Sequence, residues 1–376
     1  MVTIYYIVSS ITFLQFYIPL VIEATRLGYK NTFIVRLNYK MYANPLSKTN
    51  IITLNYYLKK YNIQQIRYDE VDIESIKGVV FTIDGDIYGP PRDILLIGNL
   101  LFPLNSDKTL KISMTEHMNF MSSYHAYIDK VDYCIFSNKH LLQQFVSKSD
   151  SIKISDDYTL TLDKSFNNPK NLFLGNTKFD NIPSEKEIFA RFKLNPTKKY
   201  CLFLFPKERN HFTPEHILNI YSHIKRIGFT IIVKARPKDK PIDLKLRGDV
   251  YVNGEFYPND SVSLMKISNL CIISSSSANE ETIFSKIPCI DLISDLRKYE
   301  RNQYLLDDKV NIRIENEDWK NMSFKKFISV VNKLERKNSN YFDSIKKKYL
   351  FTHNNTSVKI FEFIRNNHKD FLYLEN

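Results

Sequence analysis

The sequence lacks the glycine-rich loops with which many α/β proteins hold a phosphate. Only 9 of its 376 residues are glycine, and neither G-x-G-x-x-G nor G-x-x-x-x-G-K-[ST] occurs. Both loops need glycine because their backbone approaches the phosphate closely. The G-x-S-x-G nucleophile elbow is absent as well. These absences argue against P-loop NTPases and typical NAD enzymes, and they remove the usual sign of a serine hydrolase.

Cysteine is also scarce, and its positions form no recognisable pattern. The four cysteines are Cys134, Cys201, Cys271 and Cys289. Each lies in an apolar run, and none belongs to a C-x-x-C pair or stands at zinc-ligand spacing from a histidine. We interpret them as core residues of a protein in a reducing compartment.

Long hydrophobic runs are missing too. The stretch that comes nearest to one, residues 4–22, is interrupted by Ser9, Ser10, Thr12, Gln15 and Pro19. A membrane-spanning helix needs about 18 to 20 apolar residues. No positively charged segment precedes the short apolar run at the start, so no secretory signal is expected. We therefore expect a cytoplasmic protein without a transmembrane helix.

The charge balance is basic, with 53 Lys and Arg against 41 Asp and Glu, a net charge of +12. Such a balance favours anionic partners: phosphorylated substrates, an anionic membrane surface or nucleic acid. Basic amphipathic helices expected within residues 321–365 are candidates for peripheral membrane contact, although a solvated helix face is the favoured interpretation. Nucleic acid is the least favoured partner, and the oligomeric state cannot be read from the sequence.

Apolar, β-branched runs alternate with helical or polar connections along the first half of the chain. This alternation is typical of α/β domains. The expected strands are 2–8, 32–37, 78–83, 95–101, 110–114 and 131–136. A helix is expected between the first two strands, with Gly28 just beyond its end.

The second half repeats the alternation after a polar segment with two prolines. Its expected strands are 200–205, 229–233, 250–252, 270–273 and 287–293. Thr213-Pro214-Glu215 carries the signals of a helix start: an N-cap, a proline at the first position and an early acid. We predict two Rossmann-like domains that face each other across a cleft, with helices at the C-terminus. The predicted ranges are 1–175, 176–340, and 341–376 packing back toward the first domain.

The segment 269–294 reads NLCIISSSSANEETIFSKIPCIDLIS. An apolar run, a polar turn, a helix and a second apolar run form a parallel βαβ unit, with the serines at the carboxyl end of its first strand. In open α/β sheets ligands bind at that edge. Ser275 and Ser276 would offer hydroxyl donors to a phosphate, and Glu281 could accept both hydroxyls of a ribose. The alternatives are a capping box, Ser277-x-x-Glu280, and an exposed first-turn acid.

Cations follow two other predicted strands of the second half. Lys234 and Arg236 stand at the end of one strand, where they could clamp a phosphate; a solvated loop is the alternative. A second cationic group follows the strand that ends at residue 205. Its members are Lys207, Arg209 and His211. Tyr257, in a loop before a helix, is a candidate for stacking on a base, or a surface aromatic partly covered by its loop.

In the first half, polar residues that could transfer a proton follow two strands. Glu116 and His117 come after the strand that ends at residue 114, and a histidine there can be a general base because its pKa lies near neutrality. Asp84 and Asp86 follow residue 83. A capping or loop role for the histidine, and turn formation by Asp-Gly, are the alternatives.

Several of these segments resemble, in the same order, motifs of the GT-B superfamily of nucleotide-sugar enzymes. Residues 175–180, GNTKFD, resemble the GNPxxD turn, and residues 234–237, KARP, resemble the KxHP strand end. Residues 273–281 resemble the nucleotide loop SDSSGxxEE, residues 286–290 resemble GKPVI, and residues 355–360 resemble the closing GxASxRI helix. The similarity is to the branch with CDP-glycerol glycerophosphotransferases, surface-polysaccharide glycosyltransferases and UDP-N-acetylglucosamine 2-epimerases, and it covers residues 170–365.

This resemblance implies a donor site in the second domain and an acceptor site in the first. Carried over by motif, Ser275, Ser276 and Ser277 would contact phosphate and Glu281 the ribose. The implied activity is an inverting, metal-independent glycosyltransferase that uses a nucleotide-diphosphate sugar and a glycan or polyol-phosphate acceptor, with no further cofactor. A 2-epimerase is the alternative, although its HxEAG motif is absent. A non-catalytic binding protein of the same fold is the third possibility.

Overall fold

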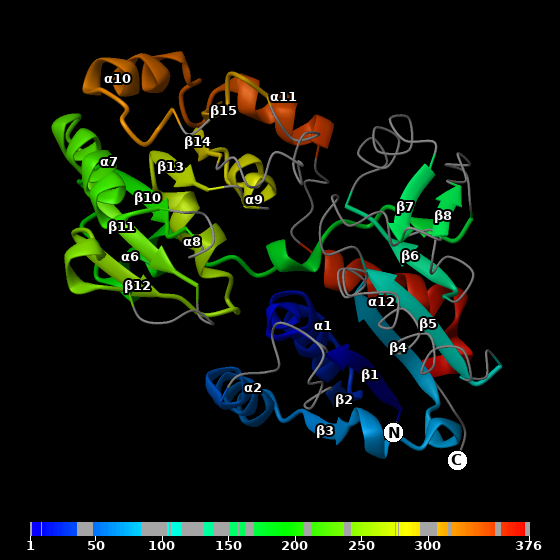
Figure 1. Ribbon diagram of the computed structural model, residues 1–376. Coiled ribbons are helices and arrows are strands. Elements are labelled where there is room, and N and C mark those ends of the chain that lie inside the picture. Colours follow the sequence, from blue (N-terminus) through cyan, green and yellow to red (C-terminus); the bar gives the residue numbers. More distant parts are fainter. Residues whose placement is uncertain are drawn as a thin grey trace. The chain divides into compact units, whose positions relative to one another are not determined.

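The computed structural model describes most of the chain. The described residues are 2–8, 10–35, 48–83, 104, 107–114, 131–137, 151–155, 158–161, 169–206, 212–236, 242–274, 276, 278–293, 307–314, 318–349 and 355–372. The chain forms two compact units (Figure 1). Unit 1 contains Met1–Asn181 and His353–Asn376, and unit 2 contains Ile182–Thr352.

Unit 1 is built on a parallel sheet of seven strands in the order β3-β2-β1-β4-β5-β6-β9. The strands are β1 (Thr3–Val8), β2 (Lys30–Val35), β3 (Gln64–Arg67), β4 (Gly78–Ile83), β5 (Thr109–Met114), β6 (Tyr133–Ile135) and β9 (Asn171–Leu172). An antiparallel pair, β7 (Ser151–Ser155) and β8 (Tyr158–Thr161), stands apart from this sheet.

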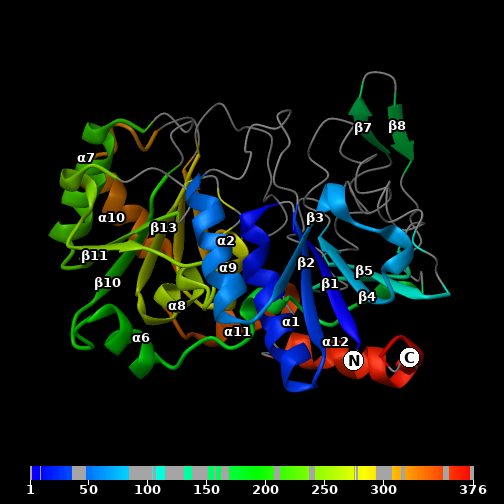
Figure 2. The same ribbon diagram turned by 90° about the horizontal axis from the view of Figure 1, so that it is seen from below.

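The helices of unit 1 include α1 (Leu14–Arg26), α2 (Lys48–Lys60) and α12 (Thr356–Asn367). Although they lie at opposite ends of the sequence, α1 and α12 pack against each other beside the sheet (Figure 2). Phe361 of α12 stacks on Tyr29 and meets Phe81 of β4 edge to face, so the last helix is part of the core of unit 1. Pro19 lies inside α1, beyond its first turn.

Unit 2 holds a parallel sheet of six strands in the order β12-β11-β10-β13-β14-β15. Its strands are β10 (Tyr200–Leu204), β11 (Thr230–Ala235), β12 (Val250–Asn253), β13 (Leu270–Ile273), β14 (Cys289–Leu292) and β15 (Asn311–Ile314). Its helices include α6 (Glu185–Phe192), α7 (Pro214–Arg226), α8 (Asp260–Ile267), α9 (Asn279–Phe284), α10 (Phe324–Lys333) and α11 (Asn340–Tyr349).

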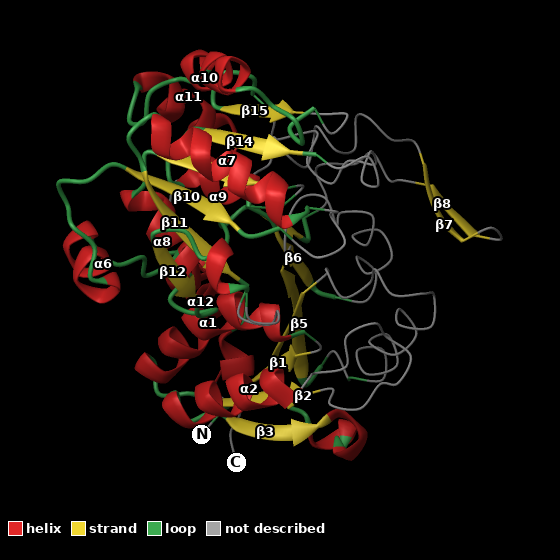
Figure 3. Cartoon of the chain, turned by 60° about the vertical axis from the view of Figure 1, so that its left-hand side comes forward, coloured by secondary structure: helices red, strands yellow, loops and turns green. Residues whose placement is uncertain are grey.

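Both faces of the sheet of unit 2 are covered by helices (Figure 3). Along β10, Cys201 and Phe203 join a cluster with α7 and α10, whereas Tyr200 and Leu202 join a cluster with α6 and α8. Because successive side chains of a strand point to opposite faces, a strand buried on both sides is apolar throughout. This explains why the strands of unit 2 read as continuous apolar runs in the sequence.

Most local predictions are confirmed wherever the structure describes the residues. The expected strands at 2–8, 78–83, 110–114, 200–205 and 270–273 are β1, β4, β5, β10 and β13. Helix α7 begins at Pro214 with Thr213 as its N-cap, and Gly28 and Gly228 follow helix ends with positive φ. The four cysteines are buried and unpaired by disulfides. Among the described residues, no helix is long and apolar enough to cross a membrane.

The two main sheets share one strand order. In each sheet the first three strands of the unit are added toward one side, and the following strands are added on the other side of the first strand. This is the order 3-2-1-4-5-6 of Rossmann folds. The order reverses between β1 and β4 in unit 1 and between β10 and β13 in unit 2. Ligands of open α/β sheets bind outside the carboxyl ends of the strands at such a reversal.

Candidate functional site

The reversal point of unit 2 carries the serine segment found in the sequence. Strand β13 lies beside β10 and ends at Ile273. Ser274 follows directly and is buried, while Ser276 is half-buried. All strands of this sheet are parallel, so the residues that follow β10, β11, β12 and β13 share one edge, here named the carboxyl edge of unit 2.

Helix α9 begins later than the sequence suggests. Its first residue is Asn279, and its N-cap is Ala278, which contributes no side-chain hydrogen bond. The capping-box alternative had Ser277 at this position, and Ser277 lies outside the described residues. The hydroxyl of Ser276 accepts a hydrogen bond of 3.3 Å from the amide of Ala278. Glu280 is buried, and Glu281, one position further along, is half-buried.

A buried polar network holds the start of α9 against β14 and β15. The side-chain amide of Asn311 donates to the Asn279 side-chain oxygen, and Asn279 Nδ2 donates to Asp291 Oδ2 at 3.5 Å. Arg313 lies 3.8 Å from the same carboxylate oxygen. Because buried polar groups are costly unless paired, this network fixes which residue opens the helix. It thereby sets where Glu281 stands at the carboxyl edge.

Lys234 is a cation of the carboxyl edge, and its side chain is buried. It lies inside β11, it is 7% exposed, and its ammonium donates to the carbonyl of Ala235 at 3.3 Å. Its side chain passes Gly254 so closely that a Cβ atom there would stand 2.7 Å from Lys234 Cε. A side chain at position 254 would therefore force the flexible end of Lys234 to shift from its place beside Asp260.

Asp260 is the centre of this cluster. Its carboxylate accepts from the amide of Glu255 at 2.6 Å and forms an ion pair of 2.9 Å with Arg191 of α6. Burial raises the pKa of Asp260, while the Glu255 amide, Arg191 and Lys234 act in the opposite direction. The carboxylate of Asp260 thus connects the segment after β12 with two cations, Arg191 and Lys234. Arg236, the other predicted clamp, follows β11 directly and is half-buried.

Tyr257 lies in the segment between β12 and α8, as expected, but its ring is enclosed. The residue is only 6% exposed, and its neighbour Phe256 is buried too. Tyr257 thus lies shortly after the end of β12, with little of its side chain accessible in the free protein.

Several predicted site residues lie outside the described part of the chain. In unit 2 these are Lys207, Arg209, His211, Ser275 and Ser277. In unit 1 they are Asp84, Asp86, Glu116 and His117. Their strands are described, however. Ile83 ends β4 and Met114 ends β5, and the two strands are parallel neighbours, so both end at the same edge of the sheet of unit 1.

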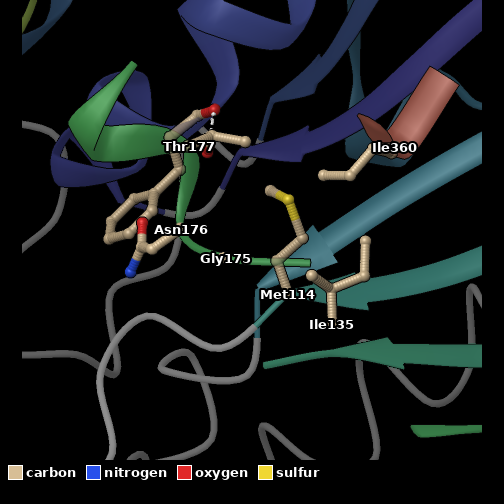
Figure 4. Close-up of a pocket in the computed structure, with 7 residues that line it drawn as sticks. Met114, Ile135, Gly175, Asn176, Thr177 and Ile360 are labelled. Atoms are coloured by element: carbon tan, nitrogen blue, oxygen red, sulfur yellow. Dashed lines mark hydrogen bonds between the residues drawn. The ribbon is translucent and has the colours of Figure 1, made fainter. Parts of the chain in front are cut away.

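A small pocket opens near this edge of unit 1. It has a volume of about 10 Å³, and its lining includes Met114, Ile135, Asn176 and Ile360 (Figure 4). That is room for about one water molecule, not for a sugar or a nucleotide. The hydroxyl of Thr177 beside it donates to the carbonyl of Phe16 at 2.8 Å. We interpret the pocket as a packing gap where the GNTKFD segment crosses the sheet.

The sequence did not reveal the polar residues that hold the segments of the carboxyl edge of unit 2 in position. No local pattern marks them: Arg191 meets Asp260 across 69 residues of sequence, and Asn279 meets Asp291 across 12. The one available signal was polarity within otherwise apolar runs, as for Asp291 in the run 287–293. Among the described residues, no three His, Cys, Asp or Glu side chains are grouped to hold a metal ion.

Neither a protein-family model nor a curated protein matches this chain. Solved structures do. The UDP-GlcNAc 2-epimerase from Neisseria meningitidis bound to UDP-GlcNAc is 12% identical, with 97% of this chain and 100% of that chain covered and a TM-score of 0.56. The wall teichoic acid polymerase TagF, soaked with CDPG, is 13% identical, with 98% and 89% covered and a TM-score of 0.58.

A third structure, the glycotransferase of kitacinnamycin, is 10% identical, with 97% and 98% covered and a TM-score of 0.57. Identities this low establish shared architecture rather than shared activity. The matches run over nearly the whole chain and agree with two Rossmann-type sheets in the same order. The chain therefore has the α/β architecture with two parallel sheets that defines the GT-B fold.

Proposed function

We propose that the chain is an inverting, metal-independent glycosyltransferase that uses a nucleotide-diphosphate sugar in the synthesis of a surface glycan or polysaccharide. The strand order of unit 2 carries the proposal. It brings the serine segment, the end of β11 and the segment after β10 to one edge at a strand-order reversal. The similar structures support it, because their names include a transferase, a polymerase and nucleotide-sugar epimerases.

In this proposal the diphosphate of the donor binds the serines and the cations of the carboxyl edge. Ser275, Ser276 and Ser277 offer hydroxyl and backbone donors, and Arg236 offers a planar fork that matches phosphate oxygens. Lys207 and Arg209 would approach from the segment after β10. Helix α9 has only six residues, so the side-chain donors matter more than its dipole. Lys234, beside Asp260, adds positive charge from within the sheet.

The nucleoside would then lie between α9 and the segment after β12. Glu281, in the first turn of α9, would accept hydrogen bonds from the ribose hydroxyls. Tyr257 would contact the base. Because its ring is buried in the free protein, stacking requires residues 254–258 to shift when the nucleotide binds.

The reaction needs a base for the acceptor and positive charge for the leaving group. The acceptor hydroxyl oxygen attacks the anomeric carbon, the bond from that carbon to the diphosphate oxygen breaks, and the hydroxyl proton passes to the base. His117, Glu116 and Asp86 are the candidates for the base, with Asp84 beside them in the sequence. The cations of the carboxyl edge stabilise the charge that develops on the diphosphate. A glycan or polyol phosphate would supply the acceptor hydroxyl.

Calorimetric titration of the full chain with UDP, GDP and CDP tests the donor site directly. We expect one of the three to bind with a 1:1 stoichiometry, and Arg236→Ala to weaken that binding about tenfold or more through the loss of a charged hydrogen bond. If none of the three binds, the proposal is wrong. Incubation of the matching nucleotide sugar with candidate glycan acceptors would then show transfer as release of the nucleoside diphosphate.

A 2-epimerase is the second candidate, because several structures of similar fold carry that name. Proton NMR of UDP-N-acetylglucosamine incubated with the protein separates the two activities. An epimer at C2 would favour the epimerase. Release of UDP that depends on an added acceptor would favour the transferase.

A further inference from the structure

Exposed large hydrophobic side chains are few in the described part of the chain, and they are concentrated on one helix. Five residues of this kind are exposed, of which three belong to α2: Ile51 (37%), Ile52 (63%) and Tyr56 (49%). The other two belong to unit 2, Leu218 on α7 and Leu244 in the short turn Leu244–Leu246. Single exposed apolar residues are ordinary, whereas a group on consecutive helical turns marks an interaction surface.

The opposite side of α2 is buried. Leu54 and Tyr57 on that side are each 1% exposed. A helix turns by about 100° per residue, which places Ile52, Tyr56 and Lys59 on the side away from these two. The exposed apolar residues therefore belong to a helix whose other side is already buried.

The charge of α2 is entirely positive. Its sequence, KTNIITLNYYLKK, contains three lysines and no acid. The ammonium of Lys60 lies 5.3 Å from the ring centre of Tyr56 and 5.4 Å from that of Tyr61. The nearest acids that follow in the sequence, Asp69 and Glu70, form ion pairs with Arg67. Apolar and cationic groups thus share one surface of a helix whose sequence contains no acid.

We propose that this surface, formed by Ile51, Ile52, Tyr56, Lys59 and Lys60 and here named the α2 face, docks unit 1 onto an anionic phospholipid bilayer. A helix lying in a membrane interface combines such groups: aliphatic side chains enter the acyl boundary, tyrosine sits at the headgroups, and lysines meet the anionic phosphates. With 13 residues, α2 is too short to cross the bilayer and would lie along its surface.

Charge also argues against a second copy of this chain as the occupant. A two-fold contact through the α2 face would bring Lys59 and Lys60 of one copy against the same lysines of the other, since both copies would use the same surface. No acid on the helix would compensate for that repulsion.

The basic helices near the C-terminus fit the bilayer less well. In α11 the ammonium of Lys346 lies 4.1 Å from the ring centre of Phe284, and Asp343 pairs with Lys286, so part of this charge is used inside unit 2. None of the described residues of α10, α11 and α12 is an exposed large hydrophobic. Peripheral membrane contact, for which these helices are the candidates on sequence grounds, is thus assigned to α2.

Co-sedimentation of the full chain with sucrose-loaded vesicles tests the proposal. Vesicles of phosphatidylcholine alone are compared with vesicles that also contain phosphatidylglycerol, at low and at high salt. We expect binding to the anionic vesicles only, weakened by salt because exposed charges are screened. The paired substitution Ile52→Glu with Tyr56→Glu should weaken binding about tenfold or more, and Lys59→Glu with Lys60→Glu should do so at low salt.

The matched control is Leu218→Glu with Leu244→Glu, which adds the same charge at the two exposed leucines of unit 2 and should leave vesicle binding unchanged. Circular dichroism of all three variants checks that they are folded. Absence of wild-type binding, or equal loss in the control pair, overturns the proposal. So does a wild-type dimer in sedimentation velocity that the Ile52 and Tyr56 substitutions dissociate, because the α2 face would then be an interface between copies.

Discussion

Asp180 caps a helix that begins 176 residues later in the chain, at Thr356. Its carboxylate accepts hydrogen bonds from the amide of Thr356 at 2.9 Å and from the amide and hydroxyl of Ser357, both at 2.7 Å. The aspartate ends the segment GNTKFD and the helix opens with the segment NTSVKI, two of the motifs that stand out in the sequence. Their shared structural role is to attach α12 to unit 1.

Replacing Asp180 should loosen α12. Asp180→Ala leaves two buried amides and a hydroxyl without their acceptor, which we expect to destabilise unit 1 by about 2–4 kcal/mol. Asp180→Asn keeps one acceptor oxygen and should recover part of the loss. Urea unfolding followed by circular dichroism measures both. Asp69→Ala is the control, since it breaks only an exposed ion pair and should cost about 1 kcal/mol or less. Equal effects of Asp180→Ala and Asp69→Ala would contradict the capping role.

The fold could be predicted because its signals are local. Strands buried on both faces read as apolar runs, and the start of α7 is marked by a threonine, a proline and an acid in succession. The cap of α12 could not be predicted in the same way. Asp180 and Thr356 carry no sign of each other in the sequence, and an aspartate after a turn is as easily explained by the turn itself.

Lys337 should make stability depend on pH in the alkaline range. Its ammonium donates to three carbonyls at the end of α8, those of Met265, Lys266 and Ser268. Burial lowers the pKa of Lys337 from 10.5 to about 8. Between these two values the unfolded chain holds the proton that the folded chain has lost, so stability rises with pH across this interval, by about 2–3 kcal/mol.

Lys337→Met isolates that contribution. Urea unfolding of both proteins should show that the wild type exceeds the variant in free energy of unfolding by about 2–3 kcal/mol more at about pH 10 than at about pH 7. A difference that stays constant would show that the three carbonyls keep the ammonium protonated in the folded protein.

Glu281 should contribute to nucleotide affinity through the ribose alone. With the nucleoside diphosphate that binds best, Glu281→Gln should raise the dissociation constant about tenfold, the expected loss for hydrogen bonds to a charged group. For the matching 2′,3′-dideoxynucleotide the same substitution should change little. Glu215→Gln, an exposed acid in the first turn of α7, is the control. Equal losses for both nucleotides would assign Glu281 another role.

Gly254 should influence nucleotide binding through Lys234. In Gly254→Ala the new methyl would stand 2.7 Å from Lys234 Cε and 3.1 Å from Asp260 Oδ2, so the flexible lysine must move. We expect a stability loss of about 1 kcal/mol and an affinity loss of about three- to tenfold. In a Lys234→Met background the same alanine should cost almost no further affinity. An undiminished loss in that background would mean that Gly254 acts independently of the lysine.

The candidate site was predictable in outline and not in detail. Strand ends followed by Ser274–Ser277 and by Arg236 indicate a single edge of the sheet, because parallel strands end together. Ser277 and Glu280 have the spacing of a capping box, whereas Asn279 at the start of α9 is held by Asn311, 32 residues away. Where a helix starts therefore depends on buried hydrogen bonds to distant residues as well as on the local sequence pattern.

The position of α12 in unit 1 has a consequence for how the chain is made. Unit 2 is an uninterrupted stretch inserted between two parts of unit 1, and it is complete at residue 352. The helix that Asp180 caps is synthesised only afterwards. Domains of most proteins fold during translation with the N-terminal one first. In this chain the synthesis of unit 2 is finished before that of unit 1. Unit 1 remains without the complete helix α12 until synthesis passes residue 367.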